Sequence, residues 1–310
     1  LSGAIAERRA RDLDLSVESL NHFTIGNLGA FGRIRDGFRP DAAVTFGGPE
    51  TFLARFSRTD VVRVRGVDID QRAGFAGLKQ RFSHSHVRAI VTPSQILADK
   101  VRVLSGSKPV FPVVLGVDTK KFQRRVPQHP KKSPNAVIFG RFDPVKGHER
   151  FLKIWRLVRD INPAATLRIV GEPANVSVDQ IKQWAAFEGL RVGQDVELVS
   201  ARVQDVAELL SSATLGVVPS VGSEIIGRVA EEFLLCGTPV LVSGVGSLEE
   251  VVFDPSAGAS WKGLDDPQVA ALVTDWLERS WQESEPEKLR RANRAAELFS
   301  IETMGMNLEK

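Results

Sequence analysis

Residues 136–171 read AVIFGRFDPVKGHERFLKIWRLVRDINPAATLRIVG, and this stretch decides the fold. The apolar run at 136–140 predicts a buried strand, residues 149–160 have the spacing of an amphipathic helix, and 166–171 form a second apolar run. A helix between two such strands is typical of a parallel sheet covered on both faces. The same alternation continues in the strands predicted at 195–200, 215–220 and 239–243 and the helices at 179–188, 207–212 and 227–236. We therefore expect an open, doubly wound sheet, whose ligands lie at the carboxyl ends of its strands.

The first half of the chain has a similar pattern. Strands are expected at 15–20, 41–48, 60–66, 88–94 and 110–118, and helices at 3–13 and 94–104. The proline-rich, basic segment QRRVPQHPKKSPN (123–135) interrupts the alternation and has the composition of a linker. We predict an N-terminal domain over 1–125, a linker over 126–135, a C-terminal domain over 136–295 and a terminal helix over 296–310 that packs back towards the first domain. A cleft between two such domains is a common place for a ligand.

Composition and charge restrict the function. Of the 310 residues 43% are hydrophobic and 25% charged, which is typical of a globular protein, and the single cysteine, Cys236, excludes an intrachain disulfide framework. The net charge is +3, but residues 1–132 carry +11 and residues 133–310 carry −8. The arginine-rich first half predicts an anionic partner such as a phosphorylated glycolipid; its alternative is a solvated basic surface. A nucleic-acid partner is disfavoured because aromatic residues for base stacking do not alternate with the basic ones.

The turn FGRFDPVKGHERF (139–151) has the residues of a phosphate site. Gly140 and Gly147 allow close approach of the backbone, and Arg141 and Lys146 place two cations beside a helix N-terminus. This arrangement suits the charge that develops on a departing diphosphate. The alternative is an ordinary strand–turn–helix connection with solvated cations.

Two glutamates eight positions apart mark the segment PSVGSEIIGRVAEEFLLCGTPVLVS (219–243). If Glu224 lies just before the helix, Glu232 lies about 12 Å further along its axis at 1.5 Å per residue. That separation is too large for the two carboxyls to flank one bond, but it suits two hydroxyl-bearing rings of one extended ligand. The alternative is that Glu231 and Glu232 are surface residues of the helix.

These motifs, in this order, resemble the donor domain of the retaining glycosyltransferases of family 4, also called glycosyltransferase group 1, which have the GT-B fold. IVTPSQILADKV (90–101), LGVDTKKF (115–122) and GSLEEVV (246–252) extend the resemblance. It implies two doubly wound Rossmann-like domains with an interdomain cleft. Family members usually begin with a strand and a glycine-rich loop, so we expect these to precede residue 1 in the native protein.

The resemblance also assigns roles to residues. Arg141 and Lys146 match the basic pair on the donor diphosphate, Glu224 the carboxylate near the transferred sugar, and Glu232 the ligand of the nucleotide ribose. The resemblance implies further donor contacts in three segments. They are Ile225, Ile226 and Gly227 in the loop after Glu224, Gly140 in the turn after the strand at 136–140, and Arg202 in the base-binding loop. Apart from the resemblance, Arg63, Arg65 and Asp68 are candidates for binding an acceptor phosphate; alternatively the two arginines pair with neighbouring side chains.

The implied reaction moves a sugar from a nucleotide sugar to an acceptor hydroxyl with retained anomeric configuration, with Glu224, Arg141 and Lys146 as catalytic residues and with no metal or cofactor. Family habit and the basic first half indicate an anionic glycolipid or polysaccharide acceptor, as in lipopolysaccharide or other cell-surface glycan synthesis. We expect a cytoplasmic protein that contacts the inner membrane face through its basic domain. Two alternatives stay open: a nucleotide-sugar epimerase of the same fold, and a non-catalytic nucleotide-sugar-binding protein.

Two further patterns have weaker interpretations. His84 and His86 alternate and would share one face of a strand, but two histidines alone are poor evidence for a metal site. Leu28, Phe31, Ile34 and Phe38 form a stripe that indicates the core face of a helix, with a membrane-surface helix as the alternative.

Overall fold

The computed structural model describes residues 41–46, 51, 54, 60–66, 84–127, 133–201, 203–222 and 224–309. The chain divides into two compact units. The first comprises Leu1–Arg65, Ala73–Ile90 and Leu104–Pro109, and the second comprises Gly66–Arg72, Val91–Val103 and Val110–Lys310. The helix and strand expected at 3–13 and 15–20, and the apolar stripe at 28–38, lie outside the described residues.

A four-stranded sheet has the order β1-β2-β3-β4, formed by β1 (Ala42–Thr45), β2 (Asp60–Val64), β3 (Ala89–Thr92) and β4 (Val110–Pro112). β1 and β2 are parallel, with Ala42 opposite Asp60. Helix α5 (Gln95–Ser105) follows β3, and the Ser94 hydroxyl accepts a hydrogen bond from the Leu97 amide at 3.2 Å, which caps its first turn. The expected strand at 110–118 ends six residues early. Its continuation leaves the sheet because the Val117 amide donates to Phe299 O at 2.7 Å.

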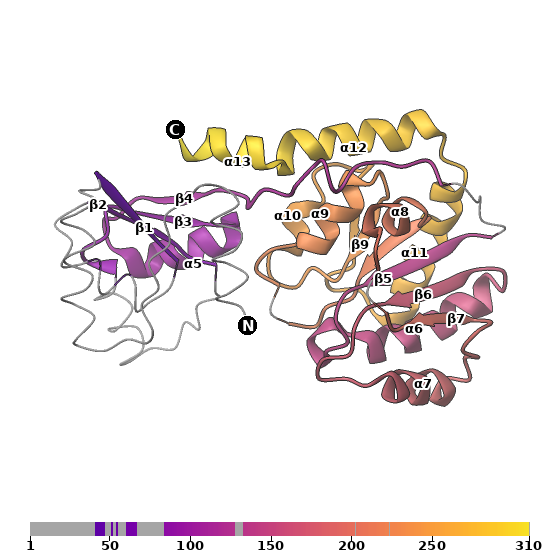
Figure 1. Ribbon diagram of the computed structural model, residues 1–310. Helices are drawn as coiled ribbons and strands as arrows, with labels where there is room; N and C mark the ends of the chain where they lie inside the picture. Colours follow the sequence, from indigo (N-terminus) through magenta and orange to yellow (C-terminus); the bar gives the residue numbers. More distant parts are fainter. Residues whose placement is uncertain are drawn as a thin grey trace. The chain divides into compact units, whose positions relative to one another are not determined.

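The second sheet has six parallel strands in the order β10-β9-β8-β5-β6-β7. Figure 1 labels β5, β6, β7 and β9 of this sheet. The strands are β5 (Asn135–Phe139), β6 (Thr166–Val170), β7 (Val196–Val199), β8 (Leu215–Val218), β9 (Val240–Val242) and β10 (Gly258–Ser260). This order confirms the predicted doubly wound sheet. The strand order reverses between β5 and β8, and doubly wound sheets bind ligands at the carboxyl ends of the strands at such a point.

Helices cover both faces of this sheet. One hydrophobic core packs the sheet against α6 (His148–Ile161), α7 (Val178–Phe187) and α11 (Asp266–Trp281), with Trp155 and Phe151 at its centre. The other packs it against α8 (Val206–Ser211), α9 (Arg228–Leu235) and α12 (Glu285–Phe299), around Phe233. Short elements complete the unit: the 3-10 turn η1 (Pro144–Lys146), α10 (Leu248–Val251) and α13 (Ile301–Leu308).

Two predicted boundaries need correction. Asn135, expected as the last linker residue, is the buried first residue of β5, and its side-chain oxygen accepts from the Thr214 amide at 3.2 Å. The segment 296–310, expected as one terminal helix, is divided between the end of α12 and α13. Ser300 has an extended backbone (φ −72°, ψ 156°), and its hydroxyl caps α13 by accepting from the Thr303 amide at 3.0 Å.

Candidate functional site

The loops that follow β5 and β8 are in direct contact at the point where the chain reverses direction. Gly147 ends η1 with φ +71°, and a Cβ placed there would lie 2.0 Å from Pro219 O. The Val221 amide also donates to Val145 O at 2.9 Å. A residue with a side chain at 147 would separate the two loops, so glycine sets how closely they approach.

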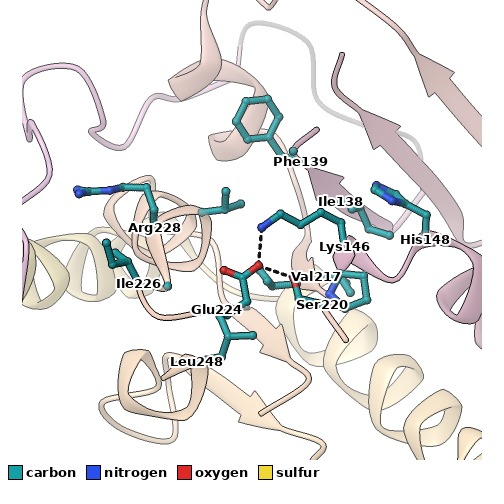
Figure 2. A pocket seen from close by; sticks show the side chains of 15 residues that line it. Ile138, Phe139, Lys146, His148, Val217, Ser220, Glu224, Ile226, Arg228 and Leu248 are labelled. Carbon is teal, nitrogen blue, oxygen red and sulfur yellow. Dashed lines mark hydrogen bonds and ion pairs between the residues drawn. The ribbon is translucent and has the colours of Figure 1, made fainter. Parts of the chain in front are cut away.

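Lys146 and Glu224 face each other across this junction (Figure 2). The Lys146 ammonium is hydrogen-bonded to Glu224 Oε1, and the Ser220 hydroxyl donates to the same oxygen at 2.5 Å. Glu224 is 8% exposed, whereas the Lys146 side chain is 27% exposed. The fold thus brings together Lys146 and Glu224, two of the three predicted catalytic residues, which are 78 positions apart in the sequence.

A cavity of about 150 Å³ opens beside this pair. Gly140 on the β5 side and Ile226 and Gly227 on the β8 side line it together with Lys146 and Glu224, as predicted for the donor site. Residues from the ends of β5 and β8, their loops and the starts of three helices complete its wall: Ile138, Phe139, His148, Val217, Val218, Pro219, Ser220, Arg228, Val229 and Leu248.

The turn that follows β9 fixes the backbone of the Glu224 loop through Gly246 and Ser247. Gly246 has φ +63°, and a Cβ on it would lie 1.8 Å from Glu224 O. The Ser247 amide donates to Glu224 O at 2.8 Å and its hydroxyl donates to Ile225 O at 2.6 Å. The backbone of residues 224 and 225 is therefore fixed before α9 begins at Arg228.

Asp143 fixes the turn that carries Lys146. One of its carboxylate oxygens accepts from the Val145 amide at 3.1 Å and the other from the Asn175 side chain at 2.7 Å. These hydrogen bonds, first the one from Val145 and then the one from Asn175, lower the pKa of Asp143. His148, in the first turn of α6, is buried, and burial lowers its pKa to about 4, so the imidazole is neutral at physiological pH.

Arg141 lies in a neighbouring hollow. It is exposed and, with Lys121 and Glu172, lines an open groove of about 580 Å³ over the carboxyl ends of β5, β6 and β7. Phe139 and Gly140 line both this groove and the smaller cavity of Lys146. The two predicted diphosphate ligands thus belong to adjoining hollows, an arrangement that suits an extended ligand.

Glu231 and Glu232 are both buried on α9, at 2% and 9% exposure, so their interpretation as surface residues is wrong. Burial raises the pKa of each to about 7, while the positive charge of Arg228 opposes this rise. Lys121, which lines the open groove, is a second positive charge near Glu232. Glu232 lines neither this groove nor the smaller cavity, so its role as the ligand of the ribose stays a prediction.

The sequence reasoning missed Ser220 and Arg228. Ser220 is fully buried and lies four residues before Glu224. This short spacing is the one feature of the sequence that could have indicated a contact between the two side chains. The Arg228 guanidinium donates to Leu115 O at 3.3 Å and to Gly116 O at 2.8 Å, and it points away from the Lys146–Glu224 pair (Figure 2). It therefore ties the start of α9 to the segment that follows β4.

The remaining predicted residues belong to the first unit or lie outside the described part of the chain. Arg202 and Asp68 are outside it. Arg63, on β2, and Arg65, just after it, are buried.

The histidine pair is not on a strand: His84 is buried, and His86 Nε2 donates to Thr51 O at 2.6 Å. Within the described ranges, no three His, Cys, Asp or Glu side chains gather as metal ligands would. No helix among the described residues is long and apolar enough to cross a bilayer.

Comparison with known proteins identifies a family that this chain matches. Residues 119–297 match the family described as glycosyl transferases group 1. D-inositol 3-phosphate glycosyltransferase of Segniliparus rotundus is 32% identical over 171 residues, covering 53% of this chain and 35% of that protein. Glycogen synthase of Mycobacterium tuberculosis is 27% identical over 214 residues, covering 67% and 48%. The chain spans about a third to a half of the length of the curated relatives it matches.

Solved structures match over more of the chain. Anabaena HepE in complex with UDP and glucose has a TM-score of 0.75 at 18% identity, covering 98% of this chain and 87% of that one. Sucrose-phosphate synthase of Thermosynechococcus elongatus has a TM-score of 0.73 at 19% identity, covering 94% and 80%. These likenesses confirm the predicted α/β fold of GT-B type.

Proposed function

Because the chain belongs to the glycosyl transferases group 1 family, we propose that it moves a sugar from a nucleotide-diphosphate sugar to an acceptor hydroxyl. The observation that carries the proposal is the cluster of Lys146, Glu224 and Ser220 where β5 and β8 end. This is the position at which doubly wound sheets bind nucleotides. HepE, which has the same fold, was solved with UDP and with UDP-glucose.

In this proposal Lys146 and Arg141 bind the diphosphate. Gly140 lines both hollows that contain the two cations, which supports one extended ligand that occupies both. Their charge would stabilise the negative charge that grows on the departing nucleoside diphosphate, a task that in other enzymes falls to a metal ion. We therefore propose that transfer proceeds without a metal.

Glu224 would accept hydrogen bonds from the transferred sugar, and the backbone of Ile225, Ile226 and Gly227 would contact the same ring. The Ser220 hydroxyl and the Ser247 contacts hold this carboxylate and its loop in place, and such preorganisation favours the transition state. Glu232 would bind the ribose and Arg202 the base. In this proposal Glu224 binds the sugar hydroxyls and does not attack the anomeric carbon, and the transfer is a front-face displacement with retention of configuration.

The acceptor we propose is anionic, of the phosphorylated glycolipid or cell-surface glycan class. The +11 charge of residues 1–132 supports this proposal. So does the name of the inositol 3-phosphate glycosyltransferases, because it gives those relatives a phosphorylated acceptor. Arg63, Arg65 and Asp68 are the residues we assign to its phosphate, and a cytoplasmic position at the membrane face would supply a lipid-linked acceptor.

A donor panel tests the proposal. Thermal unfolding with UDP, GDP, ADP and their glucose or mannose conjugates identifies the nucleotide, because a ligand that binds only the folded protein raises Tm. With that donor, we expect Lys146→Ala and Glu224→Ala to lower transfer at least about 100-fold with little change in Tm. Wild-type turnover by either variant would contradict the site, and release of an isomerised nucleotide sugar without any acceptor would instead indicate an epimerase.

A further inference from the structure

The Lys146–Glu224 ion pair uses the ammonium that the proposed donor diphosphate requires. Glu224 Oε1 has two partners, the Lys146 ammonium and the Ser220 hydroxyl. A diphosphate that binds Lys146 must therefore compete with a carboxylate of the protein itself. Breaking a partly buried ion pair is favourable only if both partners find new ones.

The two partners differ in their freedom to move. The fully buried Ser220 holds the Glu224 carboxylate, and Ser247 holds the Glu224 backbone. Lys146 lies on the other loop, with a long side chain that is 27% exposed. A rotation of the lysine side chain would exchange the carboxylate for a phosphate without breaking the bond between Ser220 and Glu224.

We propose that Glu224 competes with the donor diphosphate for the Lys146 ammonium, so that this ion pair opens when the diphosphate binds and re-forms as the nucleoside diphosphate leaves. The inference rests on the proposed function, because it assigns the diphosphate to Lys146. Its consequence is that the carboxylate which holds the sugar also weakens the binding of the product. Transfer therefore retains its catalytic cation without tight product inhibition.

Calorimetric titration of the nucleoside diphosphate, at concentrations up to millimolar, measures this competition. The probe is UDP, GDP or ADP, whichever raises the wild-type Tm most. Glu224→Gln keeps the shape and the Ser220 contact but removes the charge, and we expect the affinity to rise about fivefold, as for a partly exposed ion pair. Glu249→Gln is the matched control, because Glu249 pairs with Lys262 at 2.6 Å outside the cavity, and its affinity should equal that of the wild type.

A double-mutant cycle separates competition from simple repulsion between the carboxylate and the diphosphate. In a Lys146→Ala background, Glu224→Gln should give no gain, since no ammonium remains to be released. A gain of the same size in that background, or none in the wild-type background, would overturn the inference while leaving nucleotide binding intact. A wild type that binds none of the three nucleotides would remove the proposed function and this inference together.

Discussion

Gly147→Ala tests whether the contact between the two loops creates the site. The substitution keeps every charge of the site and adds one methyl group between Lys146 and the loop of Ser220. Two costs arise. The left-handed backbone at φ +71° costs an alanine about 1 kcal/mol, and the new Cβ would lie 2.0 Å from Pro219 O.

The second cost is the larger one. Cβ atoms rarely approach another heavy atom within 3.0 Å, and the obstacle here is backbone. The loops must therefore separate by about 1 Å. We expect a loss of about 3 kcal/mol in the free energy of unfolding, which is the range for a buried clash. A 1 Å displacement of Lys146 from Glu224 should also lower kcat/KM about 100-fold.

Gly189→Ala is the matched control. Gly189 has φ +69°, but a Cβ on it would meet no atom within 4 Å. It should therefore lose only about 1 kcal/mol of unfolding free energy and retain wild-type transfer. Thermal unfolding and initial rates with the donor from the panel compare the two variants. Equal effects of the two substitutions on Tm and on rate would refute the reasoning.

Two further substitutions test buried charges of the second unit. Arg124→Ala removes a nearly buried guanidinium that is bonded to Glu285 at 2.7 Å and to Ser211 O. Denaturant unfolding should show a loss of about 2 kcal/mol in the free energy of unfolding, against less than about 0.5 kcal/mol for Arg294→Ala, which removes an exposed ion pair on α12. Equal losses would contradict this expectation. Glu231→Gln should raise Tm at pH 8.5 but not at pH 5. Burial raises the pKa of Glu231 from 4.5 to about 7, so its ionisation destabilises the fold progressively between these values and fully above pH 7. A Tm gain independent of pH would contradict the assignment.

The sequence predicts β5 to β9, but not β10, because these five strands are short, mostly apolar runs, and the central ones are buried on both faces. β5 and β8 are such runs, and their predicted positions agree with the structure to within two residues. β4 was predicted too long, because its continuation is apolar for another reason: it packs beside α12, and Val117 bonds to Phe299 O. A tertiary partner 182 positions away cannot be inferred from local periodicity.

The site was partly predictable for a similar reason. Loops after parallel strands gather at one edge of the sheet, so Lys146 and Glu224 could be assigned to one region from their positions after β5 and β8. Their direct contact depends on β5 lying next to β8, which is a property of strand order. The hydrogen bond of Ser220 and the carbonyl contacts of Arg228 depend on loop backbone and rotamers, for which the sequence has no periodic signal.

The central claim is that this site binds a donor diphosphate. A crystal structure tests it most directly, with the bound nucleotide sugar that raises Tm most. We expect the diphosphate oxygens within hydrogen-bond distance of Lys146 Nζ and beside Arg141, with the sugar hydroxyls on Glu224. A nucleotide bound elsewhere, with Lys146 still bonded to Glu224, would contradict the account.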